Sequence, residues 1–158
     1  MQMSQHGLSL LEQWEGFKLQ VYKDSAGLPT IGVGHLLTRS ELTSGKIVIN
    51  GVPVKYSGGL TQQQVTDLLA QDVVPAQQAV NTGVKVALNQ NQFDALVSFT
   101  FNVGNGAFLG STLLKVLNQG QYDQVPTQLL RWTRAGGVVV QGLVNRRQNE
   151  IKLWNGQV

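Results

Sequence analysis

The apolar positions at the start of the chain recur at helical spacing. Between Leu8 and Trp14 an apolar side chain returns every three residues, which places these side chains on one face of a helix. Ser4 is a candidate N-cap before this segment, and Gly16 follows it as a candidate terminator. The pattern therefore predicts a helix over residues 8–15.

Strand-like alternation follows this helix. Residues 17–33 alternate between apolar and polar or small side chains, with turn-forming residues at 24–27. A second hairpin is indicated by the apolar segments Lys46–Ile49 and Val52–Lys55, which flank Asn-Gly at 50–51. That dipeptide fits a two-residue turn with positive φ at both positions.

From residue 60 onward the pattern is that of helices to the end of the chain. Capping boxes begin at Thr61 and Asn89, each followed by an apolar stripe. Pro75 is expected to kink the first of these helices. The remaining predicted helices begin at Ser111 or cover Gln121–Trp132 and Leu143–Trp154, with a loop around Gly136-Gly137 before the last.

The order of these elements predicts the α+β class. A β-rich lobe (16–59) is inserted after the first helix, and a larger helical lobe comprises 1–15 and 60–158. We expect residues 1–158 to form a single domain, since this length suits one hydrophobic core, with a cleft between the lobes.

Composition narrows the functional classes. The net charge is +3 and the pI is about 9.4, which favours anionic polymers as partners. The basic residues are scattered and no aromatic-basic strand motif is present, so nucleic acid is not expected. With no cysteine and only two histidines, we expect neither a metal nor a cofactor. No 18-residue apolar segment or secretory signal pattern is present, so no stable membrane insertion is expected.

Two of the nine acidic residues have a suggestive placement. Glu15 ends the first predicted helix, and Asp24 begins the turn of the following hairpin. The negative end of the helix and the neighbours Trp14 and Phe17 favour a protonated carboxyl group at Glu15, as a general acid requires. A solvated helix-end glutamate is the alternative. Glu12, one turn earlier and without comparable partners, serves as the comparison.

Asp24 alone is explained by an Asx-turn, but the strand that follows suggests a ligand. By period-two alternation Thr30, Gly32 and Gly34 share one face. Two glycines in a strand are poor packing choices unless a ligand approaches the backbone. That face is therefore a candidate sugar-binding floor, with Thr30 beside Asp24 to orient a water molecule.

Further charged residues are candidates for supporting roles. His35 falls on the opposite, core face of that strand, and Asp72 lies on the apolar stripe of its helix, where a buried carboxylate needs a partner. We expect His35 and Asp72 to form a structural ion pair that joins the lobes. Near the C-terminus Arg147 is a candidate surface partner of Glu150, and Arg146 could reach Glu15 and hold its rotamer.

With these residues in place, the chain resembles the phage-type lysozymes, or endolysins, of glycoside hydrolase family 24. The resemblance rests on the spacing of Glu15, Asp24 and Thr30, on the segments Tyr22-Lys23-Asp24 and 30–35, and on Asn145-Arg146. It covers about residues 8–154. The Lys46–Lys55 hairpin and the shorter helical lobe are closer to lambdoid-type relatives than to the T-even form.

The resemblance implies hydrolysis of the β-1,4 bond between N-acetylmuramic acid and N-acetylglucosamine in peptidoglycan glycan strands. It implies that Glu15 is the general acid, that Asp24 and Thr30 act on water, and that Arg146 rather than Arg147 is the partner of Glu15. It also supports the pair of His35 with Asp72. A monomer is expected, held in the host cytoplasm until a holin gives it access to the wall in the periplasm.

Two other functions remain open. A lytic transglycosylase needs one glutamate and no water, and it leaves anhydro-sugar ends, but Asp24 and Thr30 would then have no role. A non-catalytic wall-binding module would keep the cleft without needing either carboxylate. For the hydrolase, inversion is favoured over retention, and the separation of the two carboxyl groups distinguishes these outcomes.

Overall fold

A computed structural model describes all residues, 1–158. The chain forms two compact units. One contains Leu8–Val73, and the other contains Met1–Gly7 together with Val74–Val158. Helices and small antiparallel sheets both occur, so the predicted α+β class is confirmed. None of the helices is long and apolar enough to cross a membrane.

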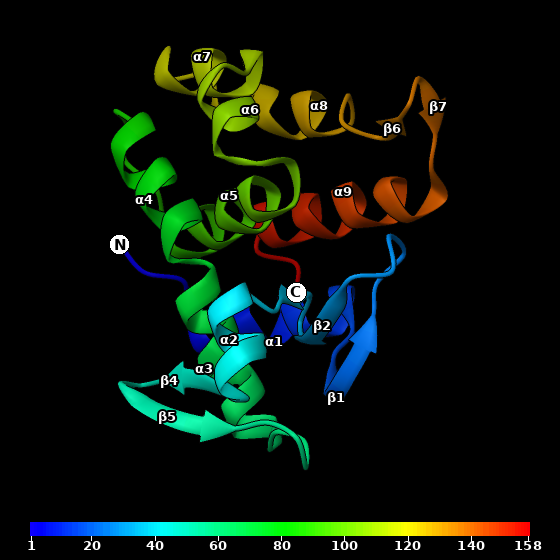
Figure 1. The fold of residues 1–158 in the computed structure, drawn as a ribbon. Coiled ribbons are helices and arrows are strands. Elements are labelled where there is room, and N and C mark those ends of the chain that lie inside the picture. The colour runs from blue at the N-terminus through cyan, green and yellow to red at the C-terminus, as the bar shows by residue number, and fades with distance from the viewer. The chain divides into compact units, whose positions relative to one another are not determined.

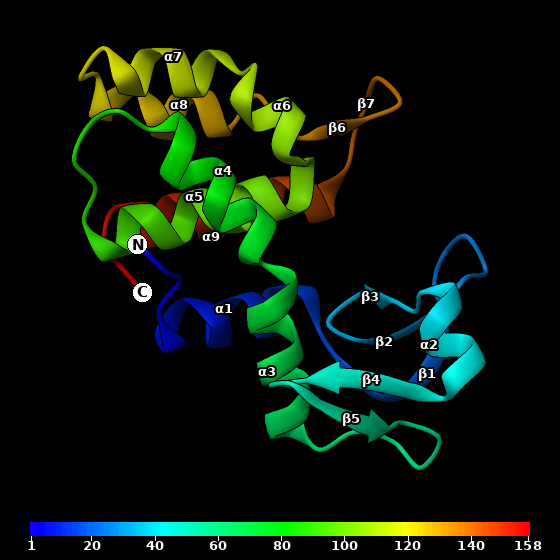
Figure 2. The ribbon, with the colours of Figure 1, turned by 60° about the vertical axis from the view of Figure 1, so that its left-hand side comes forward.

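The first unit carries most of the strands (Figure 2). Its elements in chain order are α1 (Gln5–Glu15, whose first three residues belong to the other unit), β1 (Lys18–Lys23), β2 (Pro29–Gly32), β3 (His35–Leu36), α2 (Arg39–Ser44), β4 (Lys46–Ile49), β5 (Val52–Lys55) and α3 (Gln62–Asp72).

Helix α1 begins at Gln5, three residues earlier than the apolar pattern predicts and directly after the predicted N-cap Ser4. The Oγ of Ser4 accepts a hydrogen bond from the backbone N–H of Gly7 at 3.0 Å, as an N-cap does. The helix ends where predicted. Gly16 has φ +72° and its N–H donates to the carbonyl of Glu12 at 2.8 Å, a left-handed conformation that glycine adopts without a Cβ penalty.

Strands β1, β2 and β3 form an antiparallel sheet in that order. Ile31 on β2 is fully buried, and β2 packs against α3, whose buried face carries Val65, Leu68 and Leu69. The predicted hairpin of β4 and β5 is confirmed. Asn50 and Gly51 have φ of +52° and +76°, so this turn matches the strand twist.

The sequence interpretation missed helix α2, although a local signal was present. Thr38 and Glu41 form a complete capping box, in which each side chain accepts a hydrogen bond from the other residue's backbone N–H. The helix is only six residues long and buries no side chain, so its sequence contains no apolar stripe that would indicate a helix.

The second unit is mainly helical (Figure 1). Its elements are α4 (Val74–Gly83), α5 (Gln90–Val103), α6 (Asn105–Leu109), α7 (Thr112–Asn118), the 3₁₀-helix η1 (Tyr122–Gln124), α8 (Val125–Leu129), β6 (Arg134–Ala135), β7 (Val138–Val139) and α9 (Gln141–Trp154). The capping boxes at Thr61 and Asn89 and the cap at Ser111 are confirmed. Between α3 and α4 the helix breaks, one residue before Val74-Pro75, since proline cannot supply an interior N–H.

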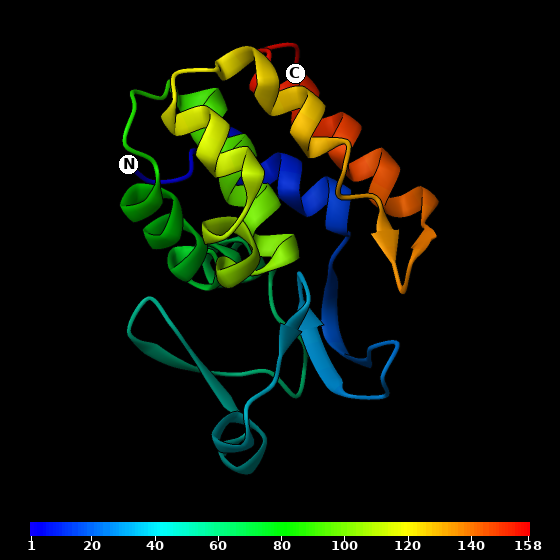
Figure 3. The same cartoon turned by 90° about the horizontal axis from the view of Figure 1, so that it is seen from above.

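The region before α9 differs from the prediction. The single helix expected over Gln121–Trp132 is divided into η1 and α8, and the chain then forms the β6–β7 hairpin (Figure 3). Gly136 and Gly137 have φ of +58° and +78°, which provides the tight turn between these strands. The expectation that the chain is helical from residue 60 to the end is therefore wrong.

Candidate functional site

Glu15 is the last residue of α1, and it lines a pocket of about 360 Å³. The pocket wall also contains Gly16, Phe17, Lys18 and Tyr22. Gly16, in the left-handed conformation, ends α1 two residues before β1 begins, so the end of the helix adjoins the first strand in the sequence. An acid, an ammonium group and two aromatic rings therefore surround one opening, a combination suited to a polar ligand with apolar faces.

The neighbours Trp14 and Phe17 do not bury Glu15. Glu15 is exposed and Phe17 is 40% exposed, because both lie at the rim of an open pocket rather than in the core. Lys18 and Tyr22 were not predicted as site residues. The pairing of β1 with β2 shifts register between Lys18 and Tyr22, so simple strand alternation could not have placed them on one face.

Asp24 forms the Asx-turn that the sequence suggested. Its Oδ1 accepts hydrogen bonds from the N–H groups of Ala26 and Leu28, both at 2.9 Å. These bonds fix the carboxylate against the backbone of the turn, whereas Oδ2 makes no hydrogen bond within the chain. The turn therefore holds a carboxylate that keeps one oxygen available to a ligand or water molecule.

Thr30 lies on β2, opposite Tyr22 on β1, and is 2% exposed. Its hydroxyl donates to the carbonyl of Leu28 at 2.9 Å. Because that proton is committed, Oγ1 can act toward a water molecule only as an acceptor. The hydroxyl is thus oriented by the same residue whose N–H binds Asp24.

The predicted common face of Thr30, Gly32 and Gly34 is wrong. Strand β2 ends at Gly32, and both glycines have φ +65°, so the period-two alternation stops there. A Cβ built on Gly32 would lie 3.6 Å from Val65 Cγ1, toward α3. The positive φ explains both glycines. Contact of Gly32 or Gly34 with a substrate stays a prediction.

The predicted pair of His35 and Asp72 is confirmed, with a third partner that the sequence did not suggest. His35 Nδ1 lies 2.8 Å from Asp72 Oδ2, and Nε2 lies 2.9 Å from Glu41 Oε1. The hydrogen bond that His35 donates to Asp72, assisted by Glu41 and opposed by burial, raises the pKa of His35 to about 9. All three residues lie within Leu8–Val73, so the cluster joins β3 to α3 and α2.

The Glu41 carboxylate accepts hydrogen bonds from both the His35 ring and the Thr38 backbone N–H. Burial by itself raises the pKa of the Glu41 carboxyl, but the hydrogen bonds from the Thr38 backbone and from His35 outweigh burial and lower it. The capping box of Thr38 and Glu41 was the signal that could have placed this carboxylate near His35.

Glu12 does not serve as the unpartnered comparison that the sequence suggested. It is 8% exposed and its Oε1 accepts a hydrogen bond from the hydroxyl of Thr66 at 2.5 Å. Glu12 therefore links α1 to α3 inside the unit, whereas Glu15, one turn later, opens on a pocket. The two glutamates of one helix have different environments.

The pair of Arg147 and Glu150 exists but is not on the surface. Both side chains are fully buried, and Arg147 Nη1 lies 2.9 Å from Glu150 Oε1 as an ion pair without hydrogen-bond alignment. Arg147 also donates to Asn102 Oδ1 and lies 5.0 Å from the ring centroid of Phe99. Packing of α9 against α5 removes the pair from water.

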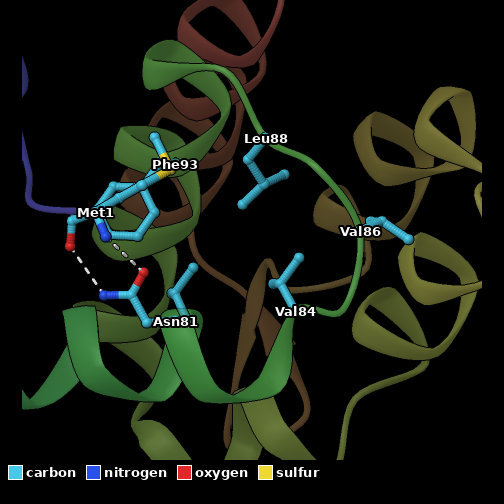
Figure 4. Close-up of a pocket in the computed structure, with 7 residues that line it drawn as sticks. Met1, Asn81, Val84, Val86, Leu88 and Phe93 are labelled. Atoms are coloured by element: carbon cyan, nitrogen blue, oxygen red, sulfur yellow. Dashed lines mark hydrogen bonds between the residues drawn. The ribbon is translucent and has the colours of Figure 1, made fainter.

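A separate cavity of about 80 Å³ lies beside the N-terminus (Figure 4). Its wall is apolar apart from Asn81, whose amide binds the amino group and the carbonyl of Met1 at 3.0 and 2.8 Å. No carboxylate, imidazole or hydroxyl lines it, so it offers no catalytic chemistry. The chain also contains no cluster of three or more His, Cys, Asp or Glu side chains that could hold a metal ion.

Comparison with known proteins shows the family to which the chain belongs. The family model described as phage lysozyme matches residues 12–150. The endolysin of Bacillus phage PZA is 41% identical over 160 residues, covering 98% of this chain and 55% of that protein. The endolysin of Salmonella phage P22 is 40% identical over 136 residues, covering 86% of each. The chain thus spans little more than half of the first relative and most of the second.

The fold agrees as well. The structure of the endolysin from Escherichia coli O157:H7 phage FAHEc1 matches with a TM-score of 0.82 at 37% identity, covering 100% of this chain and 96% of that one. This match establishes the lysozyme-like α+β fold that the sequence predicted. The chain belongs to the phage lysozyme family.

Proposed function

We propose that the chain is a muramidase that hydrolyses the β-1,4 bond between N-acetylmuramic acid and N-acetylglucosamine in peptidoglycan. Membership of the phage lysozyme family supports a glycoside hydrolase of peptidoglycan. Glu15 is proposed as the general acid that protonates the leaving oxygen. Asp24 and Thr30 are proposed to direct the attacking water molecule.

The observation that carries this proposal is the placement of Glu15 in an open pocket with Tyr22 in its wall. An aromatic ring can pack against the apolar face of a sugar while a carboxyl group donates a proton to its glycosidic oxygen. Asp24 and Thr30 follow on the adjoining hairpin, both held by Leu28. The second carboxylate is thereby fixed before a substrate arrives.

Other residues of the predicted site have supporting roles in this proposal. Arg146 is proposed to pair with Glu15 and hold its rotamer. His35 and Asp72 stabilise the unit that carries the hairpin, without touching substrate. For the reaction itself we propose inversion, which needs room for water between the carboxyl groups, with a separation of roughly 6.5–9.5 Å.

In its biological setting the protein is proposed to be a monomer that acts on the glycan strands of the cell wall. We propose that it remains in the host cytoplasm until a holin gives it access to the periplasm, where its activity lyses the host.

The deciding experiment compares Glu15→Gln and Glu12→Gln on purified peptidoglycan. The two variants carry the same substitution one turn apart on the same helix, but only Glu15 lines the pocket. Loss of a general acid should lower the rate on the order of 10²–10⁴-fold, while Glu12→Gln should clear peptidoglycan at nearly the parent rate.

Product analysis by mass spectrometry completes the test. Hydrolysis leaves reducing muramic acid ends, whereas 1,6-anhydro ends would identify a lytic transglycosylase. No products at all from the folded parent protein would instead indicate a wall-binding module. If Glu15→Gln remains as active as the parent, Glu15 is not the acid.

A further inference from the structure

The β6–β7 hairpin exposes apolar side chains on both of its faces. Val138, Val139 and Val140 follow directly after the glycine turn, and they are 67%, 52% and 38% exposed. In the register of the hairpin Val139 lies opposite Arg134, which is also exposed. Because successive residues of a strand point to opposite faces, Val138 and Val139 place aliphatic groups on different faces. Neither face of this hairpin is therefore buried.

The β4–β5 hairpin of the same chain shows the usual arrangement. Its Ile47 and Ile49 are buried and β4 packs on α3, whereas Val48 between them is 56% exposed. Strands β6 and β7, by contrast, have no extensive contact with another helix or strand of their unit, and the hairpin projects from those helices (Figures 1 and 3). A two-stranded hairpin without a packed face is only marginally stable in water, so a partner that covers the valines would stabilise it.

The charges beside the valines are all positive. Between Asp123 and Glu150 every charged residue is an arginine, and two of these, Arg131 and Arg134, are exposed. Arg134 Nη1 donates to the carbonyl of Gly137 at 3.1 Å, which holds this cation at the turn of the hairpin. The side chain of Arg131 makes no hydrogen bond or ion pair within the chain. A partner complementary to this surface therefore carries negative charge.

Trp132 lies between the two arginines in the sequence and combines an apolar ring with a polar group. Its ring packs edge-on against Phe99, with the ring centroids 5.3 Å apart. The side chain is partly exposed, and its indole N–H donates no hydrogen bond within the chain. Tryptophan with one apolar side and an available N–H is enriched where a bilayer meets water.

The distribution of these groups favours a lipid surface over a glycan or a second protein. Valine side chains offer a glycan neither hydrogen bonds nor an aromatic ring. The surface of a globular partner covers one face of a hairpin, whereas the boundary region of a bilayer surrounds a projecting hairpin on both faces. Arginines next to the apolar groups then meet the phosphates of anionic lipids.

We propose that the β6–β7 hairpin binds reversibly to the surface of bilayers that contain anionic lipids. Val138, Val139 and Val140 enter the boundary between headgroups and acyl chains, and Arg131 and Arg134 contact lipid phosphates. This activity goes beyond the proposed hydrolysis of peptidoglycan and does not depend on it. It would hold the protein at a membrane surface without any segment spanning the bilayer.

The first test measures sedimentation of the protein with vesicles made of equal parts phosphatidylglycerol and phosphatidylcholine. The parent should bind these vesicles, and Val138→Ser combined with Val139→Ser should bind about tenfold more weakly, because apolar burial is lost at unchanged charge. The matched control combines Val48→Ser with Val52→Ser. These two valines are 56% and 59% exposed on the β4–β5 hairpin, and their replacement should leave vesicle binding unchanged.

A second test separates the local cations from the general attraction of a protein with net charge +3. Arg131→Gln should weaken binding to the mixed vesicles about fivefold, the effect of one basic residue at an anionic surface. Arg39→Gln, at an exposed position on α2, changes the net charge equally and should have a much smaller effect. Vesicles of phosphatidylcholine alone should bind the parent more weakly than the mixed vesicles do.

The third test locates the hairpin directly. The chain contains no cysteine, so Val139→Cys can carry a polarity-sensitive fluorophore at a single position. Its emission should shift to shorter wavelengths when the mixed vesicles are added. The same label at Val52→Cys should show no such shift. Circular dichroism of all variants confirms that they are folded.

Three outcomes would overturn the inference: no binding of the parent to the mixed vesicles, an equal loss for the Val48 and Val52 control, or equal emission shifts at both labelled positions. The hairpin variants should clear purified, lipid-free peptidoglycan at the parent rate. Slower clearance with unchanged vesicle binding would mean that the hairpin contacts the glycan instead. None of these results bears on Glu15→Gln, which tests the proposed function separately.

Discussion

Asp24 and Thr30 are held by the same residue, Leu28. The N–H of Leu28 donates to Asp24 Oδ1, and the carbonyl of Leu28 accepts from both the N–H of Asp24 and the hydroxyl of Thr30, with all three distances at 2.9 Å. A single peptide segment thus sets the positions of both groups that are proposed to direct water. Asp24 can therefore hold the turn and also serve the proposed catalytic role, because the two roles do not compete.

These contacts predict that the two roles of Asp24 can be separated by substitution. Asn in place of Asp24 keeps an acceptor for the N–H groups of Ala26 and Leu28, so the free energy of unfolding should be nearly unchanged. Activity should nevertheless fall on the order of 10²-fold or more, since the charge is lost. Urea unfolding and peptidoglycan clearance measure the two effects.

Asp24→Ala should differ in one respect only. It removes both turn hydrogen bonds and should also lower the free energy of unfolding by about 1–2 kcal/mol. Asp123→Asn, at an exposed position on η1, is the control for removing a carboxylate. Equal stability of Asp24→Asn and Asp24→Ala would show that the Asx-turn does not support the hairpin.

The His35 cluster predicts a stability difference that depends on pH. The folded-state pKa of about 9 lies above the ordinary value of 6.5. The contribution is therefore fully present below pH 6.5 and is lost as the pH rises through about 9. His35→Gln should lower the free energy of unfolding by about 1–3 kcal/mol at pH 6, allowing for partial solvent screening.

At pH 10 the parent and His35→Gln should differ much less in urea unfolding than at pH 6. His6→Gln is the matched control, because His6 is exposed and its ring forms a hydrogen bond with the carbonyl of Val158 but with no carboxylate. A difference between parent and His35→Gln that stays constant from pH 6 to pH 10 would mean that the protonated imidazole does not stabilise the fold.

The left-handed conformation of Gly32 and Gly34 predicts that a residue with a side chain at either position would strain the backbone. Both have φ +65°, and the nearest atoms to a Cβ at Gly32 are at ordinary contact distance, while Gly34 has open space. Alanine at either position should therefore lower the free energy of unfolding by about 1–2 kcal/mol, the typical cost of left-handed backbone. Thermal unfolding of the two variants checks this, with Gly142→Ala, on α9 with open space, as the control.

The activity of the same glycine variants tests the predicted substrate contact. If the glycines serve only the backbone conformation, both variants should keep the parent KM at a temperature where they are folded. A raised KM in Gly34→Ala without a matching loss of stability would instead restore the substrate role.

The buried carboxylate of Glu150 predicts a large effect on stability. Glu150→Gln leaves two guanidinium groups in the core without their anion, which should lower the free energy of unfolding by about 3–5 kcal/mol. Gln148→Ala, two residues earlier and exposed, should change it by less than about 0.5 kcal/mol. Denaturant midpoints of both variants measure the difference, and a midpoint near that of the parent for Glu150→Gln would mean that this carboxylate does not contribute to folding.

The sequence alone determined the features that depend on a few consecutive residues. Capping boxes at Thr61 and Asn89, the Asn-Gly turn at 50–51 and the helix end at Gly16 all appear where their local signals place them. These signals suffice because a cap or turn is completed by hydrogen bonds within about four residues. Glu15, Asp24 and Thr30 also lie within one short segment of the chain, so their spacing could be recognised in the sequence.

Only the tertiary structure decided which side chains are removed from water. Ser98 and Glu150 are 52 residues apart and meet because α5 packs on α9, so no local pattern could place the Arg147–Glu150 pair in the core. Glu12 is buried for the same reason, through Thr66 on α3. Burial and the ion pairs that it strengthens depend on partners that folding brings together, whereas turns and caps are complete within their own segment.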